Sequence, residues 1–74
     1  MPLAGDRVWF IGESSNEELY GELVVRGVRY IGMVPGTVVV KGVDNKEEAF
    51  NGYAVWAKDL SYREPVLEES YLYD

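Results

Sequence analysis

Glycine, proline and asparagine divide this chain into short runs, and this spacing restricts its fold more than any other feature. Turn-forming pairs stand at Gly5-Asp6, Pro35-Gly36 and Asn51-Gly52, and such pairs favour β-turns and hairpin loops. The runs between them are rich in the β-branched and aromatic residues that strands prefer. No apolar pattern keeps a helical period beyond a turn or two. The sequence therefore predicts an all-β domain.

The expected elements can be placed along the chain. Residues 7–11 predict a first strand and residues 12–18 a solvated loop. Residues 19–26 and 27–33 predict a strongly bent strand pair, because glycines inside strand patterns mark bulges and bends. Residues 37–43 carry a continuous valine run, which predicts burial on both faces or a central place in a sheet. A strand from Tyr53, a 3₁₀ turn at residues 58–60 and a short last strand complete the set.

About five short strands in 74 residues favour a small SH3-like barrel over a sandwich of two sheets. We expect residues 1–64 to form this barrel. Residues 65–74 form a C-terminal tail, either a short helix that begins at Pro65 or a loose terminus.

The absence of cysteine and histidine excludes disulfide bonds and the usual zinc and redox sites. Stability must then come from packing, and the aromatic residues are the expected core. For Trp56 two outcomes stay open: a core residue, whose replacement by alanine costs about 3–5 kcal/mol, or part of an interface. The expected core residues are Trp9, Phe10, Tyr30, Phe50, Tyr53 and Trp56.

The charge balance restricts the partners. Seven Lys and Arg against 13 Asp and Glu give a net charge of −6, which repels phosphate backbones and argues against nucleic-acid binding. No apolar run approaches the roughly 20 residues that span a bilayer, and no leader pattern opens the chain. We therefore expect no membrane partner and a cytoplasmic location.

The carboxylates are expected to be solvated rather than catalytic, because they lie in polar loops. The serines have no histidine to act as a base. Residues 44–47 lack the alternating oxygen ligands of an EF-hand loop. The sequence thus predicts no enzyme activity, no cofactor and no metal.

The chain has two Trp, six Tyr and two Phe, more rings than so small a barrel can enclose, and surplus exposed rings mark binding surfaces. Together with nearby acids they would bind a protein or peptide partner that carries basic and apolar residues. The expected function is a non-catalytic protein-interaction module or accessory subunit. The alternative is an acidic inhibitor or nucleic-acid mimic that occupies a basic cleft of a partner protein. The expected binding residues are Tyr20, Phe50, Tyr53, Tyr62, Glu17, Glu18, Glu47 and Glu48.

Residues 27–37, preceded by Gly5-Asp6-Arg7-Val8 and followed by residues 40–44, resemble a CAP-Gly domain. That family folds as a glycine-rich SH3-like barrel. The resemblance implies binding of acidic, aromatic C-terminal tails such as those of tubulin, through a groove built around a Gly-Lys-Asn-Asp-Gly motif. Residues 44–52 read DNKEEAFNG in the corresponding place, so the motif is absent and no family binding residue is carried over.

The valine run also bears on self-association. Lys41 is the single charge in residues 37–43, and an unguarded edge strand tends to pair with another chain. If this strand lies at the rim, a homodimer is expected, formed by edge pairing or through Tyr71 and Tyr73. The net charge opposes such a dimer.

Overall fold

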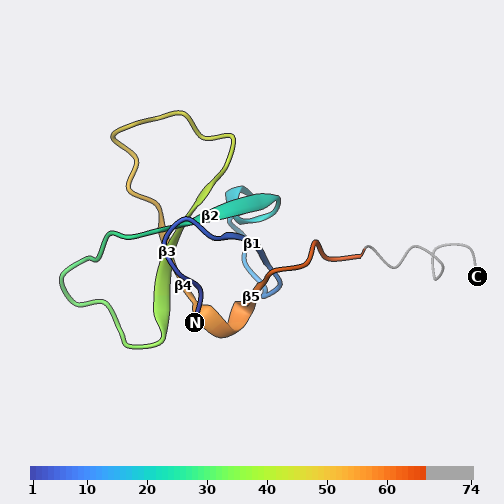
Figure 1. Ribbon diagram of the computed structural model, residues 1–74, viewed down its shortest axis with the longest axis horizontal. Coiled ribbons are helices and arrows are strands. Elements are labelled where there is room, and N and C mark those ends of the chain that lie inside the picture. The colour runs from blue at the N-terminus through green and yellow to red at the C-terminus, as the bar shows by residue number, and fades with distance from the viewer. Residues whose placement is uncertain (67–74) are drawn as a thin grey trace, which may run out of the picture.

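The structure is a computed structural model that describes residues 1–66 (Figure 1). It confirms the all-β prediction, because its regular elements are strands and single 3₁₀ turns. The predicted helix or loose terminus of the tail, with Tyr71 and Tyr73, lies almost wholly outside the described residues. The elements are β1 (Arg7–Phe10), η1 (Glu17–Leu19), β2 (Glu22–Arg26), β3 (Thr37–Gly42), β4 (Tyr53–Trp56), η2 (Ala57–Asp59) and β5 (Leu60–Ser61).

The five strands form one antiparallel sheet in the order β4-β3-β2-β1-β5, which curls into a half-barrel (Figure 1). β1, β2, β3 and β4 follow one another as a meander, and β5 returns to pair with β1. η2 supplies the 3₁₀ turn that was predicted before the last short strand. This small, curled half-barrel of five strands has the all-β, barrel-like architecture expected from the sequence.

One face of the curled sheet carries the core. The register sets Val8 opposite Leu23 and Val25 opposite Val40, and directly opposed residues of neighbouring strands share a face. Leu19 of η1 is also buried, so this 3₁₀ turn closes over the core. The buried cluster consists of Val8, Phe10, Leu19, Leu23, Val25, Val40 and Val55.

β3 is buried on both faces, as the valine run predicts. Val40 and Val39 are 0% and 1% exposed, although neighbouring strand residues point to opposite sides. On the outer side Gly52 lies close to Val39, and the Arg26 Nη1 and the Tyr30 hydroxyl donate to the carbonyl oxygens of Phe50 (3.2 Å) and Gly52 (3.1 Å). Because β3 pairs with both β2 and β4, it has no open edge. The rim position on which edge pairing through residues 37–43 depends is therefore not met.

The strand predicted at residues 27–33 is absent, and residues 27–36 form a loop, here called the 27–36 loop. The amide of Met33 donates to the carbonyl oxygen of Tyr30 (3.2 Å), and Gly32 has a φ of 85°. A turn with positive φ at this position interrupts the extended backbone. The turn expected at Pro35-Gly36 is present, with the Thr37 amide bonded to the Val34 carbonyl oxygen (3.3 Å).

The predicted aromatic core is largely wrong. Of the six aromatic residues proposed for it, only Phe10 is buried; Trp9, Phe50 and Tyr53 are half-buried, and Tyr30 and Trp56 are exposed. Trp56 stands opposite Thr37 on the outer face, where its ring lies beside Gly36. Valine and leucine side chains fill the narrow interior of the half-barrel instead.

Candidate functional site

Tyr53 is the centre of the predicted site. It lies in β4, where its ring packs against the core cluster and its hydroxyl donates a 2.6 Å hydrogen bond to Glu18 Oε2. The Phe50 ring meets the Tyr53 ring edge-on, with 4.9 Å between centroids and 62° between planes. The hydrogen bond between Tyr53 and Glu18 joins β4 to η1, which are far apart in the sequence.

Local geometry fixes the position of Glu18. Asn16 precedes η1, and its Oδ1 accepts a hydrogen bond from the Glu18 amide (3.1 Å), as a helix N-cap does. Leu19, the next residue, is buried in the core. Glu17 and Glu18 are consequently held on an exposed 3₁₀ turn. Asn16 caps its start, and the buried Leu19 fixes its end.

The electrostatics of this group favour a neutral tyrosine beside a carboxylate. The hydrogen bond to Glu18 raises the pKa of Tyr53 above its usual value, with smaller contributions from partial burial and from the charges of Glu18 and Glu47, against an opposing bond with Asn16. Glu47 belongs to residues 43–52, which join β3 to β4 and are called the 43–52 loop. Tyr53 therefore stays a donor to Glu18 well into alkaline pH.

A shallow hollow of about 320 Å³ opens beside Glu18. The ring of Tyr20 packs edge-on against Phe10, with centroids 5.8 Å apart. Its hydroxyl accepts from the Ser14 amide (2.9 Å) and donates to the Ser14 carbonyl oxygen (2.8 Å), so the half-exposed ring is held in place. We call this feature the acidic hollow; its lining is Glu18, Tyr20, Gly21, Glu22, Gly42, Asp44 and Asn45.

Cations offset part of this charge. Arg7 pairs with Glu22 at 3.2 Å, and Lys41 Nζ lies 3.5 Å from the carbonyl oxygen of Glu47. Lys46 is exposed in the 43–52 loop. The neighbourhood stays negative, because its acids outnumber these cations; the acids are Glu17, Glu18, Glu22, Asp44 and Glu47.

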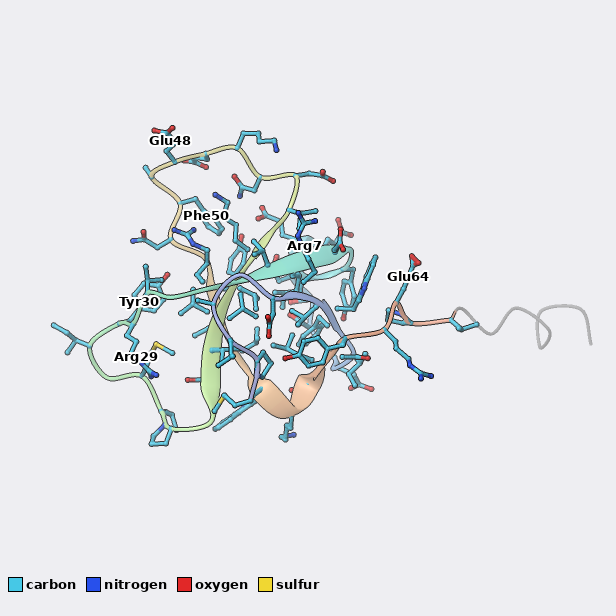
Figure 2. All side chains as sticks on the ribbon, viewed as in Figure 1. Arg7, Arg29, Tyr30, Glu48, Phe50 and Glu64 are labelled. Atoms are coloured by element: carbon cyan, nitrogen blue, oxygen red, sulfur yellow. The ribbon has the colours of Figure 1, made fainter. Side chains whose placement is uncertain are left out.

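Two of the predicted site residues do not join this group. Glu48 lies at the tip of the 43–52 loop and points outward (Figure 2). Tyr62 follows β5, at the opposite end of the strand order from β4, and its hydroxyl donates to Asp6 Oδ2 (2.8 Å). The structure thus groups Glu17, Glu18 and Glu47 with the rings of Tyr20, Phe50 and Tyr53, and it places Glu48 and Tyr62 elsewhere.

Sequence reasoning missed an apolar surface on the 27–36 loop. Ile31 is fully exposed and Val34 is 54% exposed, and Arg29 and Tyr30 lie on the same projecting loop (Figure 2). The alternating pattern was interpreted as a strand, which hid this surface. One signal was present: the stretch from Leu23 to Val43 contains Arg26, Arg29 and Lys41 but no acidic residue.

Within residues 1–66, no group of three or more acidic side chains is arranged to hold a metal ion. In the same part of the chain, no helix has the length and apolar character needed to cross a bilayer.

Comparisons of this chain with protein-family models, with curated proteins and with solved structures found no match.

Proposed function

We propose that this domain is a non-catalytic protein-interaction module, or an accessory subunit, that binds a basic and apolar segment of a partner protein at the acidic hollow. The observation that carries the proposal is the Glu18–Tyr53 hydrogen bond of 2.6 Å beside the exposed ring of Tyr20. The charge of Glu18, the fixed ring of Tyr20 and the open hollow thus lie in one place. We also propose a cytoplasmic location, because a chain without cysteine fits a reducing compartment.

The chemistry of the hollow suits such a segment. Tyr53 uses one oxygen of Glu18, and an ionised carboxylate has further acceptor positions for a lysine or arginine. Tyrosine is enriched at the energetic centres of interfaces, because a rigid ring buries a large area at little cost in entropy. Tyr20 presents such a ring to an apolar side chain, while the surrounding acids accelerate association with a basic partner.

An acidic inhibitor or nucleic-acid mimic is the second candidate. Glu17, Glu18, Glu47 and Glu48 are exposed on two loops, which is how carboxylates could fill a basic cleft. The two functions differ in salt dependence. A mimic should lose affinity steeply as salt rises, whereas a segment that also packs apolar side chains on the Tyr20 ring should lose less.

A peptide titration of the full chain tests the proposal. The probe is a labelled nine-residue peptide of alternating arginine and leucine, and its binding is measured by fluorescence polarisation. Replacing Glu18 by glutamine keeps an acceptor for Tyr53 but removes the charge, so we expect the dissociation constant to rise about three- to tenfold, or roughly 1 kcal/mol.

Glu64→Gln is the matched control, because Glu64 is exposed (Figure 2) and does not line the hollow. It removes the same charge and should leave binding within error. Equal weakening by both variants would mean that net charge alone attracts the peptide. That result, or an absence of binding, would contradict the proposed site.

A further inference from the structure

We infer that the segment taken by the acidic hollow is the 27–36 loop of a second copy of this chain, so that copies associate head to tail. The inference rests on the proposed function, which gives the hollow a preference for a basic and apolar segment. It adds the identity of the partner.

Charge is separated along the chain in the way this association needs. The acid-free stretch from Leu23 to Val43 contains Arg26, Arg29 and Lys41. The acidic hollow is lined by Glu18, Glu22 and Asp44. Of these cations, Arg29 lies in the 27–36 loop itself, whereas Arg26 bonds to the Phe50 carbonyl oxygen and Lys41 lies near the hollow. The loop is thus locally positive in a chain of net charge −6, and opposite local charges can guide two copies together despite their overall repulsion.

The 27–36 loop has the required apolar side chains in an exposed position. It projects from the sheet (Figure 1), with Ile31 and Val34 exposed and Arg29 exposed beside them. Ile31 and Val34 can cover the ring of Tyr20. The guanidinium of Arg29 offers paired donors that match a carboxylate.

The loop is also held in shape before binding. The Met33 amide donates to the Tyr30 carbonyl oxygen (3.2 Å), and the Tyr30 hydroxyl donates to the Gly52 carbonyl oxygen (3.1 Å). Ordering a segment on binding costs entropy, so a loop with these bonds already formed loses less.

The topology requires a second copy for this contact. The 27–36 loop joins the end of β2 to the start of β3, whereas the hollow is lined by Gly21, Glu22 and Gly42 at the opposite ends of the same two strands. β2 from Glu22 to Arg26 spans roughly 13 Å, at a rise of about 3.3 Å per residue. A loop and a receptor at opposite ends of one molecule generate a head-to-tail contact.

Sedimentation velocity of the full chain, from about 10 μM to 1 mM, tests the inference. We expect the mean mass of the native chain to rise with concentration. Arg29→Glu reverses the loop's charge and Asp44→Lys reverses an exposed acid of the hollow, so each variant alone should have a dissociation constant raised at least tenfold. Mixing the two variants should restore association, because one intact loop and one intact hollow remain.

Matched controls separate this contact from net charge. Arg63→Glu and Glu64→Lys make the same charge changes at exposed positions beyond β5 and should associate like the native chain. A native chain that stays monomeric at 1 mM, or a variant mixture that stays monomeric, overturns the inference. Association of both site variants at native strength also overturns it, because the contact would then use another surface.

The arginine–leucine peptide distinguishes the two proposals. The Arg29→Glu chain keeps its hollow and should bind this peptide as the native chain does. If it binds while the native chain stays monomeric, the proposed function stands and the second-copy inference fails. If the peptide does not bind, the hollow itself is not a receptor for basic segments.

Discussion

Gly52 occupies a position that other residues can enter only with strain. Its φ is 116°, and a Cβ atom there would lie 2.6 Å from the Val40 carbonyl oxygen and 2.7 Å from Val39 Cγ1. Both the backbone angle and the close approach to β3 therefore require glycine. Because this approach covers the outer side of Val39, the residue contributes to the burial of β3 on both faces.

Gly52→Ala should destabilise the domain by roughly 1–3 kcal/mol, measured by urea unfolding. Gly42→Ala is the control, since an added Cβ at Gly42 meets nothing within 4 Å. It should be neutral or slightly stabilising. Equal losses from the two variants would show that Gly52 is not closely packed against β3.

The Asp6 carboxylate makes stability depend on pH at the acid end. It accepts a hydrogen bond from the Leu3 amide (2.9 Å) and another from the Tyr62 hydroxyl (2.8 Å). These bonds, that of Leu3 first, lower the pKa of Asp6 below its usual 3.8. The stabilisation is therefore complete above the unfolded-state pKa and is lost as the pH falls through the lowered folded-state pKa.

Tyr62→Phe should raise the pKa of Asp6 toward 3.8 without restoring it fully, because the bond from Leu3 remains. A carbon-detected NMR titration of the carboxyl group measures this. The same bond raises the pKa of Tyr62 above 10.0, so its contribution to stability is complete below the unfolded-state pKa and is lost as the pH rises through the folded-state value. An unchanged Asp6 titration in the variant would contradict the hydrogen bond.

At the scale of elements, the local residue pattern correctly predicted the position of several elements. The first strand, the valine strand and the final 3₁₀ turn with its short strand all lie where their residues indicated. The pattern failed at residues 27–33, because the alternating residues there belong to a loop. This loop exposes the side chain of Ile31, whereas the side chains of Tyr30 and Met33 form hydrogen bonds. The resemblance to CAP-Gly domains rests largely on those same residues and stays a prediction.

β4 shows why burial was harder to predict than strand position. Val55 is buried on its inner face, while the neighbouring Trp56 is 45% exposed on the outer face. Successive side chains of a strand point to opposite faces of the sheet, so the size of a ring does not decide which face it occupies. Register with β3 decides it, and register depends on distant residues that a local pattern does not reveal.

Trp56→Ala should therefore leave the domain folded, whereas Leu23→Ala should cost about 2–5 kcal/mol, because Leu23 is 0% exposed within the core. Small domains have little stability to lose, so the leucine variant should be largely unfolded near 37 °C. Near-ultraviolet circular dichroism and thermal melting compare the two. A Trp56 variant that unfolds as readily as the Leu23 variant would contradict the exposed position.

At the scale of the whole molecule, the aliphatic core and the charge distribution determine which surfaces face a partner. The core encloses valine and leucine, which leaves tyrosines and a tryptophan on or near the surface. Glu18, Glu22 and Asp44 gather at one end of the β2–β3 pair, and the acid-free 27–36 loop lies at the other.

Part of this arrangement could be predicted from the sequence. The grouping of Tyr20, Phe50 and Tyr53 with nearby acids followed from their places beside turns. The separation of Tyr62 did not, because it depends on β5 pairing with β1 rather than with β4. The acidic hollow also depends on where β2 begins and β3 ends, which pairing across the sheet determines.

The most direct test of the account is an amide NMR titration of the full, ¹⁵N-labelled chain with the arginine–leucine peptide. The proposed function predicts that the shifts concentrate in η1, at Gly21 and Gly42, and in the 43–52 loop. Shifts confined to β5 and the N-terminal residues around Asp6, or no shifts at millimolar peptide, would contradict it.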